Sequence, residues 1–141
     1  MKQKDIFAII LRRNQESLLS AIEGLSHLEM FLQLPGEGNC TNWILGHIAS
    51  YRDVMLFDSG LSSYMQPDEV QMYAGGSSPI KAGDICVDCA RLTELIDITF
   101  SDLMYWLENE NDGLRQAPVG NRKDNIGYSG VCSTCLLYTS D

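Results

Sequence analysis

The feature that most constrains the fold is an apolar helical pattern between Asn39 and Leu56. Apolar and aromatic residues recur there at spacings of three and four, which is the periodicity of one helix face. The expected buried face consists of Trp43, Ile44, His47, Ile48, Tyr51, Val54 and Met55. Asn39, Thr41 or Asn42 can cap the start of this helix, and Gly46 inside it predicts a close approach by another helix.

Two further long segments carry a helical stripe, at residues 4–23 and from Asp84 onward. The first predicts an amphipathic helix, and the capping-box spacing of Ser26 and Glu29 predicts a short helix after it. Another short helix is expected at 67–73 because Pro suits a first helical position. Asp84 is expected to cap the third long helix. Its expected buried stripe is Ile85, Cys89, Leu92, Leu95, Ile96, Thr99, Leu103, Trp106 and Leu107.

No segment alternates between apolar and polar residues as a half-buried strand does, so the sequence predicts an all-α fold. Three long helices with short elements between them predict an up-and-down four-helix bundle that lacks its fourth helix. We expect the bundle to span 1–118 and an irregular tail to span 119–141. Without a fourth helix, an apolar stripe would be uncovered, so we expect a marginally stable or self-associating chain.

The end of the tail does not have the pattern of a folded segment. Cys135 to Asp141 resembles the translation of a transposon-based sequencing adapter read in frame. We therefore expect the tail to be non-native from about residue 135, with the natural gene interrupted before its fourth helix.

The composition excludes several classes of function. Asp and Glu outnumber Lys and Arg by 19 to 10, giving a formal charge of −9. This balance argues against binding to nucleic acid, which requires clustered cations, and against docking on anionic lipid. No apolar run approaches the ~20 residues of a membrane span, and the N-terminus lacks the pattern of a signal peptide. We therefore expect a cytoplasmic protein whose five cysteines are reduced thiols.

Two Cys-x-x-Cys pairs, Cys86 with Cys89 and Cys132 with Cys135, have the pattern of a four-thiolate zinc site. The first pair lies in an expected helical stripe, and Cys135 falls in the adapter-like segment. The separation between the pairs also exceeds that of a zinc ribbon. We therefore expect no zinc here, with Cys89 in the core and Cys86 partly exposed.

His47 is the candidate for chemistry, and the residues alone leave two interpretations open. It is either a core histidine among Trp43 and Tyr51, or a metal ligand projecting into a helical bundle. A metal needs further donors, and the only other histidine, His27, is expected at the exposed start of a short helix. A Ser-His-Asp triad is not supported, because no Gly-x-Ser-x-Gly turn occurs.

The run from Asn42 to Ile48, followed by Arg52 and Asp53, resembles the second helix of the DinB/YfiT-like superfamily. Residues 21–26 are similar to the end of the family's first helix. Residues 73–80 are similar to its loop before helix three. The similarity covers roughly residues 6–112 in architecture and is specific mainly around the second helix.

The resemblance implies a four-helix bundle, often homodimeric, that binds a divalent metal such as zinc or nickel through three histidines. His47 matches the histidine of the second helix. The other two form a His-x-x-x-His run on the fourth helix, and the printed sequence contains no such run. Some members are S-transferases or isomerases that use a small-molecule thiol, bacillithiol or mycothiol, and others are metal-dependent hydrolases.

Two hypotheses about function follow. The first is a DinB-like metal-dependent enzyme with His47 as a metal ligand, for which thiol-dependent S-transfer is one candidate activity of the intact parent and inactivity is expected of this chain. The second is a non-catalytic binding or dimerisation module in which His47 is a core residue. In both, Arg52 and Asp53 are expected to be solvated or paired at the rim of the helix rather than catalytic.

Overall fold

The computed structural model describes residues 1–33, 35, 36 and 38–109. The elements in order are α1 (Gln3–Ile22), a 3₁₀ turn η1 (Glu29–Phe31), α2 (Thr41–Asp58), α3 (Pro67–Met72) and α4 (Cys89–Asn109). These residues contain helices and no strand, which confirms the all-α prediction for the described part of the chain. The predicted tail at 119–141, with Cys132 and Cys135, lies outside the described residues.

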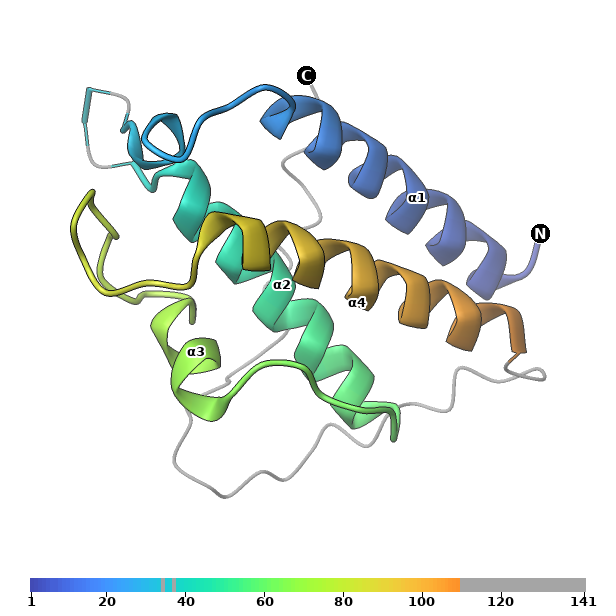
Figure 1. Ribbon diagram of the computed structural model, residues 1–141. Coiled ribbons are helices and arrows are strands. Elements are labelled where there is room, and N and C mark those ends of the chain that lie inside the picture. Colours follow the sequence, from blue (N-terminus) through green and yellow to red (C-terminus); the bar gives the residue numbers. More distant parts are fainter. Residues whose placement is uncertain (34, 37, 110–141) are drawn as a thin grey trace.

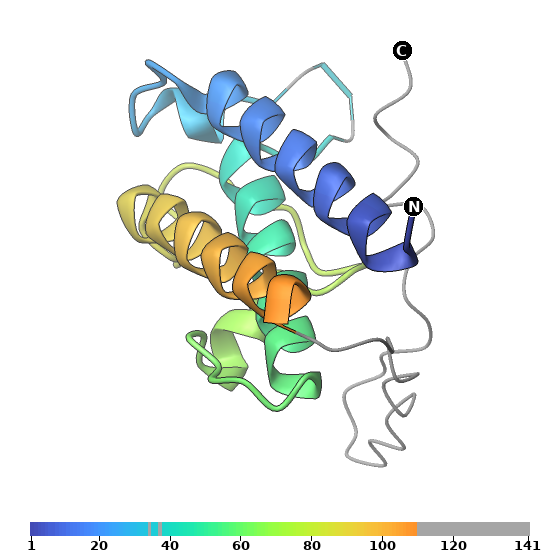
Figure 2. The same cartoon turned by 90° about the vertical axis from the view of Figure 1, so that its right-hand side faces the viewer.

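Helix α4 lies at the centre of the helix packing (Figures 1 and 2). It packs along α2 on one side and against α1, which runs in the opposite direction, on another. The core between these helices is aliphatic and includes Leu45, Ala49, Leu92, Leu95 and Ile96. A second buried cluster at the other end of α4 contains Leu11, Leu56, Leu103, Met104 and Leu107. Packing of these apolar faces, rather than helix propensity, supplies most of the stability.

The start of α4 differs from the sequence prediction. The helix begins at Cys89, and the carboxylate of Asp88 accepts a hydrogen bond from the Ala90 backbone N–H at 2.8 Å. The carboxylate of Asp84 instead accepts from the backbone N–H of Lys81 at 2.8 Å, in the preceding turn. Asp84 and Asp88 are both suitable N-cap residues. The sequence prediction assigned the cap of α4 to Asp84, whereas in the structure Asp88 caps the helix. Ile85, expected in the buried stripe, is consequently 90% exposed.

The capping box before η1 is confirmed. The backbone N–H of Ser26 donates to a carboxylate oxygen of Glu29 at 2.8 Å, and the Glu29 backbone N–H donates to the Ser26 hydroxyl at 3.3 Å. The element that follows is shorter than predicted, because it is a single 3₁₀ turn. The short helix expected at 67–73 is confirmed as α3. None of the described helices combines the length and apolar character needed to cross a lipid bilayer.

Candidate functional site

The buried face of α2 is not the one that the periodicity predicted. The side chains turned inward belong to Asn42, Trp43, Leu45, Ala49, Ser50, Arg52, Asp53 and Leu56. Of the expected face, only Trp43 is buried, while Ile44 is 43% and Met55 is 37% exposed. The prediction failed because α2 carries apolar residues on nearly all sides. Spacing alone therefore could not show which side faces the core.

A close approach does occur at Gly46, but the approaching group is the aromatic ring of Tyr73, just after α3, and not another helix as predicted. A β-carbon on Gly46 would lie 2.2 Å from Cδ1 of Tyr73. Tyr73 follows the last residue of α3 and is fully buried. Because Gly46 has no side chain, the Tyr73 ring can pack directly against the α2 backbone. This contact holds α3 and the following loop on α2.

The hydroxyl of Tyr73 joins α2 to the segment before α4. It donates to the side-chain oxygen of Asn42 at 3.0 Å and accepts from the backbone N–H of Val87 at 3.0 Å. The amide nitrogen of Asn42 donates to the Val87 carbonyl at 3.0 Å and to the Cys89 sulfur at 3.3 Å. Burial raises the pKa of the Tyr73 hydroxyl above its ordinary value, so it acts here as a neutral hydrogen-bonding group.

His47 lies half-buried between two aromatic rings of the same helix. Its ring stacks on Trp43, with centroids 4.7 Å apart and planes 14° from parallel, and meets Tyr51 edge-on at 4.6 Å. Nδ1 lies 2.8 Å from the carbonyl oxygen of Tyr73. Because a carbonyl oxygen can only accept, Nδ1 carries a proton, and in the neutral ring the lone pair is on Nε2.

Arg52 is buried, which contradicts the expectation of a solvated side chain. Its Nη1 donates to the Gln15 side-chain oxygen at 2.6 Å and to the Ile96 carbonyl at 3.1 Å. The Gln15 amide in turn donates to the carboxylate of Asp97 at 2.8 Å. This chain of bonds joins α1, α2 and α4 at one point. Burial lowers the pKa of Arg52 to about 10, while the carboxylate of Asp97 acts in the opposite direction.

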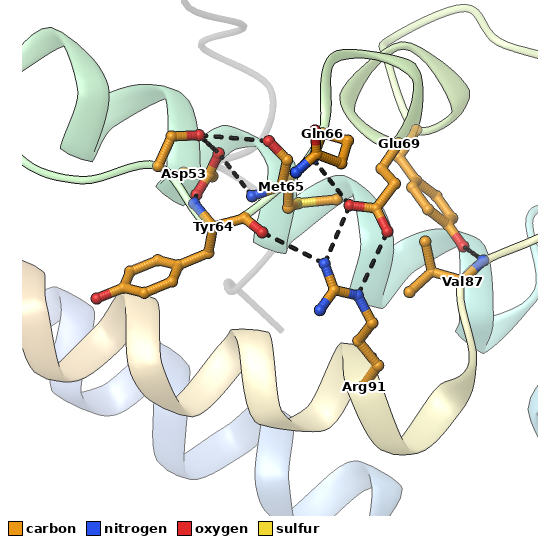
Figure 3. A network of polar contacts seen from close by, with 9 residues as sticks. Asp53, Tyr64, Met65, Gln66, Glu69, Val87 and Arg91 are labelled. Carbon is orange, nitrogen blue, oxygen red and sulfur yellow. Dashed lines mark hydrogen bonds and ion pairs between the residues drawn. The ribbon is translucent and has the colours of Figure 1, made fainter.

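Asp53 is also buried, which contradicts the expectation that it is solvated or paired at the rim of the helix. Its carboxylate accepts from the Ser63 hydroxyl and the Tyr64 backbone N–H, both at 2.6 Å, and from the Met65 backbone N–H at 3.4 Å (Figure 3). These donors belong to the loop after α2. Asp53 therefore acts as a fixed acceptor for a turn whose backbone groups would otherwise lack partners.

The same loop is held to α4 by a second set of bonds. Arg91 of α4 donates to both carboxylate oxygens of Glu69, at 3.1 and 3.3 Å, and to the Tyr64 carbonyl at 3.3 Å (Figure 3). The Tyr64 hydroxyl donates to the carboxylate of Asp102 at 2.5 Å. The sequence prediction missed these partners, since residues this far apart give no periodic signal. The clearest clue to the polar interior was a charged pair, Arg52 with Asp53, inside an otherwise apolar helix.

The cysteines of the described region behave as core residues. Cys40 and Cys89 are buried and Cys86 is partly buried, as expected for Cys89 and Cys86. Burial is the largest of the causes that raise the pKa of the Cys86 thiol. A raised pKa disfavours the thiolate, which is the reactive and metal-binding form.

The three-histidine metal site implied by the family resemblance does not fit the residues of this chain. The printed sequence has two histidines. His27 is exposed in the turn before η1, with its ring edge-on to Phe31 at 5.1 Å. Within residues 1–33, 35, 36 and 38–109, no group of three His, Cys, Asp or Glu side chains could hold a metal ion. His47 is thus a single candidate donor.

Comparisons with known proteins do not assign this chain to a family. No family model, no curated protein and no solved structure matches the chain. The resemblance around His47 therefore stays a prediction.

Proposed function

We propose that this chain acts as a helical interaction module, and that a second copy of the chain covers the outer face of α2. The observation that carries the proposal is that α2 has apolar side chains on its outer side as well as on its inner side. Arg52 and Asp53 point inward, whereas Ile44 and Met55 are exposed and Ile48 is only partly buried. A helix that is apolar on both sides is normally buried on both sides.

The outer residues form one stripe, which we call the α2 outer stripe: Ile44, Ile48 and Met55. At 100° per residue these three positions fall within a narrow sector of the helix, over about three turns. Burying a fully exposed side chain of this kind is worth roughly 1.5–3 kcal/mol. Ile44 and Met55 are 43% and 37% exposed, so each has roughly 1 kcal/mol left to gain in a contact that covers the stripe, before the cost of association is subtracted.

A second copy suits this surface because the stripe carries no charged side chain. Two chains of formal charge −9 repel one another at long range. A symmetric contact that places the two stripes together nevertheless brings no like charges into direct opposition. Charges beyond about 8 Å are largely screened at physiological ionic strength. Two α2 helices can then pack at the usual interaxial distance of about 8–10 Å.

The oligomeric state tests this proposal. We expect sedimentation equilibrium to show a dimer at tens of micromolar, a concentration set by the roughly micromolar affinity of modest interfaces. Ile44→Glu should shift the chain to monomer with unchanged helix content by circular dichroism. Ile85→Glu, at a 90% exposed loop position, is the matched control and should leave the dimer intact. A monomeric wild-type chain, or equal effects of the two substitutions, would contradict the proposal.

A second candidate function is that of a DinB-like metal protein, in which a fourth helix of the bundle would cover the α2 outer stripe and His47 would bind zinc or nickel. The specific observation in its favour is the bond from Nδ1 to the Tyr73 carbonyl at 2.8 Å. Metal-bound histidines commonly donate their second nitrogen to such an acceptor, which orients the ring. Because the donors of this chain do not complete the site, no catalytic step can be derived through a metal.

Metal content distinguishes the two candidates. With one oriented imidazole we expect weak binding, and elemental analysis of the purified chain should find far less than one equivalent of zinc or nickel. The enzyme hypothesis further requires a His-x-x-x-His run encoded downstream of Pro118, and a full-length gene without one would contradict it. Stoichiometric zinc that disappears on Cys86→Ser would instead support the four-cysteine site that the sequence analysis rejected.

A further inference from the structure

A second exposed apolar surface lies on the first turns of α1, separate from the α2 outer stripe. Ile6, Ile9 and Ile10 are 47%, 49% and 41% exposed. Leu11, on the opposite side of the same helix, is buried in the cluster with α4. The exposed isoleucines therefore do not contribute the face that packs on α4, and they leave two adjacent turns of apolar surface open to solvent.

Cations surround these isoleucines. At 100° per residue, Arg13 falls on the same side of α1 as the isoleucines, and Arg12 lies at the edge of that side. Lys2 is the residue just before the helix, and all three are exposed. Asp5, the acidic residue of this segment, accepts a hydrogen bond from the backbone N–H of Lys2 at 2.9 Å. Basic residues outnumber acidic ones in the segment 2–13, whereas acidic residues outnumber basic ones by 19 to 10 in the whole chain.

We infer that this surface docks an acidic amphipathic helix of a partner protein. We call it the α1 basic face, defined by Lys2, Ile6, Ile9, Ile10, Arg12 and Arg13. Apolar side chains of the partner would pack among the three isoleucines, as anchors spaced by three and four residues do in helix recognition. Carboxylates on the flanks of the partner helix would face Arg12 and Arg13, where charge complementarity sets orientation and association rate.

The extent of the face favours a short helix over a membrane surface. Lys2 to Arg13 spans about 17 Å along the helix axis. Exposed Glu16 follows Arg13 by less than one turn of the same helix, and exposed Glu23 lies just after the end of α1. A flat anionic bilayer would meet these carboxylates as well as the cations. A partner helix of about three turns, which extends no farther than Arg13, meets at most Glu16 at one of its ends.

Fluorescence anisotropy with the full chain tests the inference. The probe is a fluorescein-labelled helical peptide of about 11 residues, or three turns, with leucine on one face and glutamate on the other. We expect binding that weakens several-fold as sodium chloride rises from roughly 50 to 200 mM, because exposed ion pairs are screened. Arg13→Glu and Ile9→Asn should each weaken binding by about tenfold or more. Both positions are exposed, so circular dichroism should show an unchanged fold.

Matched substitutions elsewhere on the surface provide the controls. Lys81→Glu and Ile85→Asn change an exposed cation and an exposed isoleucine outside α1 and should leave binding unchanged. A peptide with lysine in place of glutamate should not bind. Equal losses from Ile9→Asn and Ile85→Asn would overturn the inference. So would loss of peptide binding on Ile44→Glu, which would assign the peptide to the α2 outer stripe. Binding to phosphatidylglycerol vesicles that depends on Arg13, without peptide binding, would assign the face to lipid and overturn it as well.

Discussion

Gly46→Ala is expected to destabilise the chain by roughly 2–3 kcal/mol, although alanine is the better helix former by about 1 kcal/mol. The added methyl group would lie 2.2 Å from Cδ1 of Tyr73. That ring cannot easily move away, because its hydroxyl is bonded to Asn42 and to the backbone of Val87. The expected result is a lower midpoint in urea-induced unfolding, followed by circular dichroism, with an unchanged slope.

Two comparisons show whether the clash is the cause. Gly75→Ala places a methyl group in ordinary contact, 3.7 Å from the Tyr51 hydroxyl, and should change stability by less than about 0.5 kcal/mol. In a Tyr73→Leu background, which removes the ring, Gly46→Ala should be neutral or stabilising. If Gly46→Ala remains equally destabilising in that background, the close approach is not what the glycine provides.

Arg52→Met is expected to cost about 3 kcal/mol of unfolding free energy. Methionine retains most of the side-chain volume but leaves the Gln15 side-chain oxygen and the Ile96 carbonyl without the donor they have now. Hydrogen bonds to charged groups are worth roughly 1.5–3 kcal/mol, and the loss of one partner from a buried polar network costs more than the bond itself. Chemical denaturation at pH 7 measures the effect.

Arg91→Met is the matched control, because the same change is made at a partly exposed arginine. Arg91 pairs with Glu69 at 3.1 Å, and pairs of this kind contribute less than about 1 kcal/mol. The free energy lost at Arg52 should therefore be at least about twice that lost at Arg91. Similar losses at the two positions would show that the buried network joining α1, α2 and α4 is not a major source of stability.

The helices were predictable from the sequence to the extent that local signals define them. The α2 helix, the short α3 and the capping box at Ser26 were all found, because caps, prolines and periodicity act over a few residues. The start of α4 was placed too early because Asp84 and Asp88 are both good caps locally. Only the hydrogen bonds made in the folded chain distinguish them.

The orientation of α2 was not predictable in the same way. Leu45, Ala49 and Leu56 form an inward stripe that is as apolar as the outward one, so the periodic pattern fits both sides of the helix. The decisive partners of Arg52 and Asp53 lie on α1, on α4 and in the loop after α2. Contacts of this kind leave no local signature, and charged residues are ordinarily placed outside.

The candidate site was only partly predictable. His47 was identified from its neighbours on α2, and the structure adds the stacking on Trp43 and the bond to the Tyr73 carbonyl. Whether it binds a metal stays a prediction, because no described cluster of donors accompanies it. Tyr73 was missed as the residue that fills the space at Gly46, since it lies 27 positions farther along the chain.

Contact between two copies at the α2 outer stripe can be observed directly by methyl NMR. A sample would mix chains carrying ¹³C-methyl methionine with chains carrying protonated isoleucine in a deuterated background. Met55 is assigned by its loss in Met55→Leu. The account predicts intermolecular cross-peaks from the Met55 methyl group to Ile44 or Ile48, which fade on dilution. A Met55 methyl group without intermolecular cross-peaks, and with a shift independent of protein concentration, would contradict it.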